Sequence, residues 1–136
     1  MRNWIWALLC VPAAGLLMAA ANSAWLAEVP AADHAMADPV AGQPDAIAAG
    51  STLYQDNCAK CHGADGNGRS SRPPVHSARI AAATDGDLFW LLKNGQPFRG
   101  MPSWDRWPED QRWQVVAWLR SIQVPAASPA AANGKQ

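Results

Sequence analysis

The sequence is poor in residues that bind metals without a cofactor. Its 136 residues hold only three cysteines and three histidines. Cys58 and Cys61 form a Cys-x-x-Cys pair, but no second Cys/Cys or Cys/His pair stands elsewhere in the chain. Because a structural zinc site takes four protein ligands, the sequence argues against one. The third cysteine, Cys10, falls in an apolar stretch and is expected to be a small buried hydrophobe without a redox role.

The patterns of several other site classes are also missing. No stretch alternates like a β-strand, which argues against the βαβ unit that carries a thioredoxin-type dithiol. The glycines between 63 and 68 have no strand before them and no Lys-Ser/Thr pair after them, which rules out a phosphate-binding loop. Lys and Arg balance Asp and Glu at 11 each, and the bases are scattered, so no nucleic-acid partner is expected. The sequence therefore predicts an all-α domain.

Cys58 and Cys61, followed directly by His62, make up the most informative motif in the chain. On one helical turn the two cysteines project to the same side, from which each thiol can add to one vinyl group of a porphyrin. His62 comes four residues after Cys58, so its imidazole leaves the same face and can reach the iron. The motif predicts one covalent haem c, with Cys58 and Cys61 as thioethers and His62 as an axial ligand of the iron.

Met101 is the candidate for the other axial position. The remaining three methionines lie in the apolar N-terminus or in an Ala/Pro-rich segment, outside the part that can fold around haem. Gly100 lets the backbone approach the ring closely, and Pro102 stiffens the loop. The alternatives are a core methionine that fills a gap, or ligation by His76 or His34.

The motif CAKCH, the run GMPSW at 100–104, and helical segments before the first and after the second resemble the monohaem class I cytochromes c. The resemblance covers about residues 46–123. It implies an all-α, class I cytochrome c-like fold in which several short helices wrap around one covalently bound haem.

The same resemblance implies a particular packing of the first helix on the last. In this family the two helices cross at a glycine and an aromatic residue. Gly50 and Tyr54 stand at the corresponding positions before the haem motif, and Trp118 or Trp113 would be the partner. The chain has eight tryptophans, and we expect those of the haem domain to pack on the ring and between helices.

We expect two polar contacts around the haem site, and the resemblance implies the first of them. The family uses a proline carbonyl about a dozen residues after the histidine to accept the imidazole N–H, and Pro74 or Pro73 fits this position. Such a bond fixes the tautomer of His62 and raises its basicity. Trp90 or Trp104 could donate an indole N–H to a haem propionate.

Residues 1–27 predict export from the cytoplasm. Arg2 supplies the positive start, and a long apolar run follows it. Small residues within 19–24 offer sites for signal peptidase. The apolar stretch at 4–25 is instead near the length needed for a membrane tether, with Trp4, Trp6 and Trp25 placed like interface aromatics. Both outcomes stay open. Either one places the haem domain in the periplasm, soluble after cleavage or anchored to the outer face of the cytoplasmic membrane.

The haem domain at 46–123 is expected to have loose segments on both sides. Residues 28–45 are rich in Ala, Pro and Asp, carry four acids and no base, and predict a disordered or partly extended linker. Residues 124–136 predict a disordered tail.

Three helices are expected inside the haem domain. The first begins near Asp45 and runs into the haem motif. The second begins with a capping box at Thr84 and ends at Gly95. The third opens with Pro108 and ends before Pro125.

These residues predict a one-electron carrier rather than an enzyme. With His62 and Met101 on both sides of the iron, the chemistry is Fe(III)/Fe(II) cycling, and sulfur ligation raises the potential. The expected setting is a periplasmic respiratory chain, with a dehydrogenase, other cytochromes or a terminal oxidase as redox partners.

Two other functions stay open. One is an electron-transfer subunit of a dehydrogenase or oxidase complex. The other is a gas-binding or peroxidase-like haem protein with an open sixth site, for which Arg99 could act over the iron. The bases from Lys60 to Arg99 either steer partners or only form a solvated surface.

Overall fold

The computed structural model describes residues 24–123 of the 136-residue chain. Within this range the chain forms six α-helices and two short 3-10 helices, and the only β-type pairings there are two isolated bridges. The expected all-α fold is confirmed. No helix in the described part is both long and apolar enough to cross a bilayer. Most of the predicted export element and the predicted tail at 124–136 lie outside the described residues.

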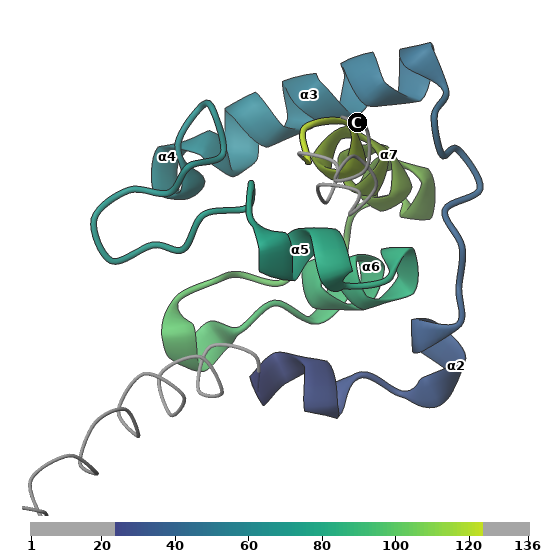
Figure 1. The fold of residues 1–136 in the computed structure, drawn as a ribbon, viewed down its shortest axis with the longest axis horizontal. Helices are drawn as coiled ribbons and strands as arrows, with labels where there is room; N and C mark the ends of the chain where they lie inside the picture. The colour runs from purple at the N-terminus through teal and green to yellow at the C-terminus, as the bar shows by residue number, and fades with distance from the viewer. Residues whose placement is uncertain (1–23, 124–136) are drawn as a thin grey trace, which may run out of the picture.

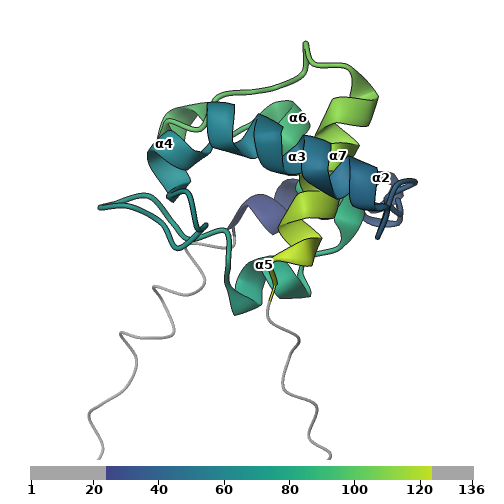
Figure 2. The same cartoon turned by 90° about the horizontal axis from the view of Figure 1, so that it is seen from above.

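Helix α3, Pro44–Asn57, lies across helix α7, Glu109–Ser121, and this crossing is the centre of the fold (Figures 1 and 2). Gly50 lies at the contact, where an added Cβ atom would come within 1.9 Å of a backbone carbonyl oxygen of α7. Only glycine lets the two backbones approach so closely. One turn further on, the rings of Tyr54 and Trp118 pack with their centroids 4.0 Å apart. The expected crossing of a glycine and an aromatic residue is confirmed, with Trp118 as the partner.

Helix α6, Asp85–Asn94, packs on α7. It begins with the predicted capping box: the Thr84 hydroxyl accepts a hydrogen bond from the Asp87 N–H, and the Asp87 carboxylate accepts one from the Thr84 N–H. Phe89 stacks on Trp113 with ring centroids 4.0 Å apart. Trp113 therefore joins α7 to α6 and takes no part in the crossing with α3.

Three short helices complete the haem domain: α4, Ala59–His62; α5, Ala78–Ala82; and η2, Pro97–Arg99. Helix α4 follows α3 almost without a break and carries the end of the haem motif. Helix α5 is capped by the Ser77 hydroxyl, which accepts a hydrogen bond from the Ile80 N–H. These elements and their loops shape the space beside the α3/α7 crossing.

Residues 24–43 are part of the folded domain, so the prediction of a loose linker at 28–45 is wrong. Helices η1, Ala24–Glu28, and α2, Ala31–His34, lie along α6 on the side away from α3 (Figure 1). Trp25 is only 5% exposed, so its predicted place at a membrane interface is also wrong. We call residues 24–43 the N-terminal strap.

Hydrogen bonds tie the strap to the first turn of α6. The Gly86 N–H donates to the carbonyl of Met36 at 3.1 Å, and the Thr84 hydroxyl donates to the carbonyl of His34 at 2.9 Å. The His34 Nδ1 atom lies 2.8 Å from a carboxylate oxygen of Asp87. Burial by itself raises the pKa of Asp87, but hydrogen bonds from Thr84 and His34 together hold that pKa below its usual value. These long-range contacts overcome the weak local propensity of the segment.

The far end of the strap buries a carboxyl group. Asp38 is 7% exposed, and one of its oxygens accepts the Val40 N–H at 2.9 Å, while the other has no hydrogen-bond partner. The Asp38 N–H donates to the carboxylate of Asp85 at 3.3 Å, and that carboxylate pairs with Arg120. Burial raises the pKa of Asp38; the Val40 hydrogen bond opposes this rise and the charge of Asp85 adds to it.

Candidate functional site

The haem motif lies where α3 passes into α4. The backbone N–H of His62 donates to the carbonyl of Cys58 at 2.9 Å, so residues 58–62 form one helical turn, as predicted. Cys58 is buried, Cys61 is exposed and His62 is half-buried, and all three line one cavity. Burial, with a smaller contribution from Cys61, raises the pKa of the Cys58 thiol to about 12, so this side chain stays neutral at neutral pH.

A backbone carbonyl orients the imidazole of His62. The Nδ1 atom lies 2.7 Å from the carbonyl oxygen of Pro73, not of Pro74. Because a carbonyl oxygen can only accept, Nδ1 carries the proton and Nε2 is left with its lone pair. The His62 carbonyl in turn accepts the N–H of Gly68 at 2.7 Å, which fixes the start of the loop that brings Pro73 back. Of the two proline positions considered from the sequence, the structure selects Pro73.

The loop after the motif is held to α3, and its backbone also bonds the segment that carries His76. The Tyr54 hydroxyl donates to the carbonyl of Gly63 at 2.7 Å, and burial raises the pKa of Tyr54, so the hydroxyl stays protonated as a donor. The Gly66 carbonyl accepts the N–H of His76 at 2.9 Å. Neither His76 nor His34 is among the residues that line the cavity.

Met101 reaches the same cavity from the loop after α6. Its N–H donates to the carbonyl of Gln96 at 3.1 Å, its carbonyl accepts from the Gln96 N–H at 2.9 Å, and the Trp104 N–H donates to the Leu92 carbonyl at 3.0 Å. These bonds fold the loop back on α6. Gly100 has a φ of +76°, so its first role is the left-handed turn that precedes Met101.

A buried arginine on α7 fixes the end of this loop. Arg112 is 6% exposed, and its Nη1 atom donates to the carbonyl oxygens of Trp104 at 3.1 Å, Asp105 at 3.2 Å and Trp107. The guanidinium lies over the ring of Phe89, 5.0 Å from its centroid. The loop that carries Met101 is therefore held to α7 by a charged donor. Sequence reasoning missed Arg112, and its only signal was a basic residue directly before the apolar part of the last helix.

The cavity has a volume of about 540 Å³ and brings together the two cysteines, His62 and Met101, although Met101 lies far from the others in the sequence. Five apolar side chains form much of its lining: Leu88, Leu91, Leu92, Val115 and Leu119. Trp25 of the strap also lines it, which the sequence did not predict. Of the two tryptophans considered as propionate donors, Trp104 lines the cavity and Trp90 does not.

These residues fit a haem group. The volume falls within the range of about 300–1,000 Å³ that is usual for cofactor pockets, and the lining is mostly apolar, as a flat porphyrin requires. Two thiols on one turn can form thioethers with a single ring, and an imidazole with a free Nε2 can ligate iron. The two cysteines and His62 are therefore the donor set of a c-type haem, and Met101 adds a sulfur atom to the same cavity.

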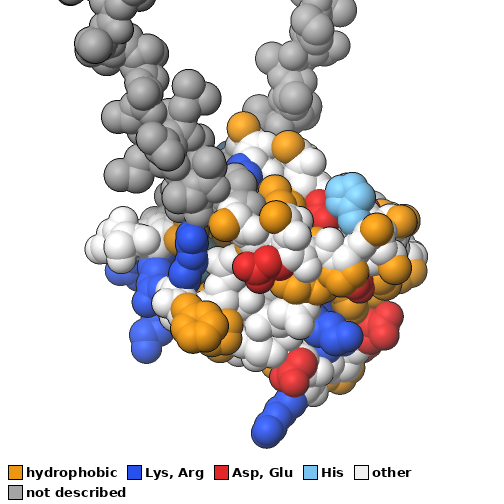
Figure 3. Space-filling model, turned by 90° about the horizontal axis from the view of Figure 1, so that it is seen from below, with side chains coloured by type: hydrophobic (Ala, Val, Ile, Leu, Met, Phe, Trp, Pro, Cys, Tyr) orange, Lys and Arg blue, Asp and Glu red, His pale blue; other side chains and the backbone are white. Residues whose placement is uncertain are grey.

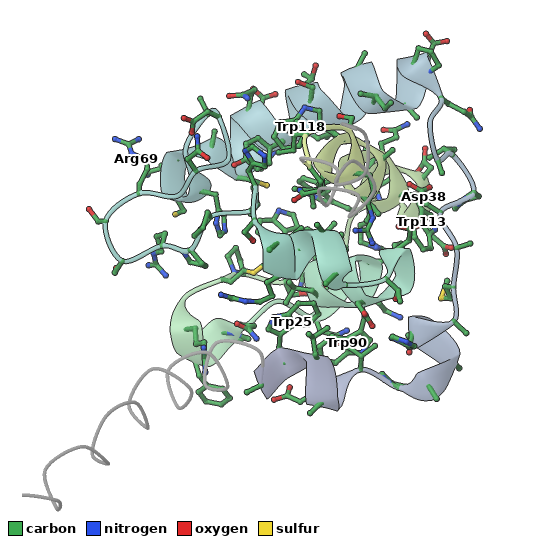
Figure 4. All side chains as sticks on the ribbon, in the orientation of Figure 1. Trp25, Asp38, Arg69, Trp90, Trp113 and Trp118 are labelled. Atoms are coloured by element: carbon green, nitrogen blue, oxygen red, sulfur yellow. The ribbon has the colours of Figure 1, made fainter. Side chains whose placement is uncertain are left out.

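Basic side chains gather at the rim. Arg72, Arg79 and Arg99 line the cavity, and Arg72 donates to the carbonyl of Arg99 at 2.7 Å. Phe98, next to Arg99, protrudes with its side chain fully exposed (106%). Figure 3 shows Lys and Arg side chains on one side of the molecule, next to a protruding hydrophobic ring. Arg69 points outward from the neighbouring loop (Figure 4).

Comparison with known proteins agrees with this geometry. No curated protein sequence matches the chain. The protein-family profile described as "Cytochrome C oxidase, cbb3-type, subunit III" matches residues 45–119, which is more than half of the chain and contains the haem motif, the Met101 loop and most of α7. This family implies a covalent haem c. With the all-α fold and the cavity between the Cys-x-x-Cys-His turn and the methionine loop, the chain belongs to the family of cytochrome c oxidase, cbb3-type, subunit III, a family of class I cytochrome c domains.

Proposed function

We propose that the chain carries single electrons through one haem c held by Cys58 and Cys61, with His62 and Met101 as the axial ligands. The observation that carries this proposal is the single cavity lined by all four side chains. When bound there, haem supplies an iron that changes between Fe(III) and Fe(II). The family supports the proposal, since cytochrome c domains are typically electron carriers rather than catalysts.

The chain's own residues prepare the site for electron transfer. The carbonyl of Pro73 accepts the Nδ1–H of His62, which leaves Nε2 free to ligate the iron of a bound haem and would raise its basicity. Arg112 restrains the loop of Met101, so the sulfur is held near its position before and after each electron passes. The leucines of the lining exclude water, and low polarity around a haem favours the reduced, less charged iron.

Redox protein partners follow from the family, which is that of an oxidase subunit. We place partner docking at the rim of the cavity, where Arg72 and Arg99 flank the exposed Phe98. An acidic partner surface would be steered there by charge, and the association rate would fall as ionic strength rises. Because the family is named for an oxidase subunit, transfer within a larger complex is the second candidate function.

The setting that we propose is the periplasm. Cytochrome c family proteins are usually extracytoplasmic. The positive residue and the apolar run that precede Ala24 suit an export signal or a membrane anchor. The mass of the mature protein decides between the two, because cleavage removes this segment.

The test compares Met101→Ala with the intact holoprotein by optical spectroscopy. We expect the intact protein to have the far-red sulfur-to-iron band and to exclude carbon monoxide in the reduced state. Met101→Ala keeps covalent haem but loses the band and binds carbon monoxide, because the sixth position opens. Covalent attachment is read as haem that stays with the chain on a denaturing gel.

Met36→Ala is the matched control, since Met36 is also a half-buried methionine but does not line the cavity. It should keep the band and exclude carbon monoxide. If Met101→Ala keeps the band as well, the axial role of Met101 is wrong. If carbon monoxide binds the intact protein readily, a gas-binding function with Arg99 over the iron replaces the carrier.

A further inference from the structure

The wall of the haem cavity contains a side chain from outside the matched family region. Trp25 lies in η1, 20 residues before the match begins at residue 45, and it is buried and lines the cavity. Figure 4 shows its indole between the strap and α6. Trp90 on α6, in contrast, is not among the residues that line the cavity.

We propose that Trp25 is a haem-contacting residue and that the N-terminal strap is a fixed wall of the haem site, which keeps water from one side of the cofactor and raises its reduction potential. This inference rests on the proposed function, since it needs a haem in the cavity. It adds a specificity-determining element that the family region, residues 45–119, does not contain.

The strap is built to stay in place. Its backbone is bonded to α6 at two carbonyls, those of His34 and Met36, and its His34 ring contacts the carboxylate of Asp87. Gly86 makes the close approach possible, because a Cβ atom there would lie 1.8 Å from the carbonyl oxygen of Asp33. Four half-buried strap side chains also pack on the core: Leu26, Val29, Met36 and Val40. Contacts of these several kinds indicate a docked element rather than a passing conformation.

Removing this wall should change the reduction potential of the haem in a predictable direction. A tryptophan buries about 150–250 Å² in a core, so its loss opens a large part of one side of the cavity to water. Water stabilises the ferric haem, which carries one more positive charge, more than the ferrous haem. The reduction potential therefore falls when Trp25 is removed or when the strap is displaced.

The first experiment measures the reduction potential of the full-length holoprotein and of Trp25→Ala by spectroelectrochemistry. We expect a downward shift in Trp25→Ala, with covalent haem and the far-red sulfur-to-iron band retained, and partial rescue in Trp25→Phe. Val29→Ala is the matched control, because it removes an apolar strap side chain that packs on the core but does not line the cavity. It should leave the potential unchanged.

A second variant displaces the strap without touching Trp25 or the cavity. Gly86→Ala places a methyl group against the backbone of Asp33, while alanine at this position favours α6 itself. We expect new proteolytic cleavage within 28–40 and the same downward shift of the potential as in Trp25→Ala. This variant keeps the test decisive even if Trp25→Ala does not yield folded protein.

Each result decides the proposal. A lower potential in both variants supports it. An unchanged potential in Trp25→Ala, or in Gly86→Ala once the strap is cleaved, overturns it while leaving the carrier function intact, because the haem and its band are still present. Absence of covalent haem from the wild-type protein overturns the proposed function itself.

Discussion

Gly50→Ala tests the helix crossing on which the haem site is built. The added Cβ atom would lie 1.9 Å from a backbone carbonyl oxygen of α7, whereas ordinary contacts are 3.4–4 Å. A backbone atom cannot rotate away, so the helices must separate and the Tyr54–Trp118 contact must loosen. Overpacking of this kind costs up to about 3 kcal/mol, and the better helix propensity of alanine returns about 1 kcal/mol. The expected net loss of stability is about 2 kcal/mol.

Thermal unfolding of the holoprotein, followed by far-UV circular dichroism, measures this loss. For a domain of this size about 2 kcal/mol lowers Tm by roughly 8–16 °C. Ala48→Gly, at an exposed position of the same helix, measures the difference in helix propensity between alanine and glycine. It should lower the free energy of unfolding by only about 1 kcal/mol. If Gly50→Ala has an equal or higher Tm, the close backbone contact is not there and the argument fails.

Three further changes test the interactions around the site. Arg112→Met leaves the carbonyls of the loop 104–107 without their charged donor. We expect the free energy of unfolding in urea to fall by about 3 kcal/mol and carbon monoxide to displace Met101 more easily. An unchanged affinity for carbon monoxide would contradict the role of Arg112 in holding this loop. Tyr54→Phe removes one buried hydrogen bond and should lose about 1 kcal/mol. Because the pKa of this tyrosine is raised in the folded state, its contribution to the free energy of unfolding is complete below about pH 10 and decreases at higher pH. Tyr54→Phe should not show this decrease. Asp38→Asn should stabilise the fold at pH 7. The pKa of the Asp38 carboxyl group is raised in the folded state, so its ionisation makes the folded protein less stable as pH rises from about 4. A lower melting temperature of the variant at pH 7 would refute this.

Local patterns predicted the parts of the fold that local chemistry determines. The capping box at Thr84 depends on residues three apart, and the turn that presents Cys58, Cys61 and His62 depends on residues within one helical turn. Such spacing is visible in a sequence. Pro73 and Pro74 could not be separated, because adjacent carbonyls point in different directions and only the path of the loop decides which one meets the imidazole.

The N-terminal strap could not be predicted for a different reason. Two of its fixed points are backbone carbonyls, those of His34 and Met36, which accept hydrogen bonds from the start of α6 about 50 residues away. A backbone carbonyl is the same at every position, so no composition or periodicity marks it. Gly86 in the first turn of α6 was an available signal that another backbone approaches this helix closely. Trp25 was a large apolar side chain able to line the haem cavity.

The size of the haem cavity links these elements to folding. At about 24 cal/mol per Å³, a cavity of about 540 Å³ left unfilled would cost up to about 13 kcal/mol, which is as large as the whole stability of a typical domain. The figure is an upper bound, because the rim near Cys61 and Arg99 is open to water. The leucines of α6 and α7 and the indole of Trp25 share an apolar space, which the haem that we propose at Cys58 and Cys61 would fill. Because the strap, the methionine loop and the helix crossing all border this cavity, we expect that replacing both cysteines, and so losing the proposed haem, destabilises all three together.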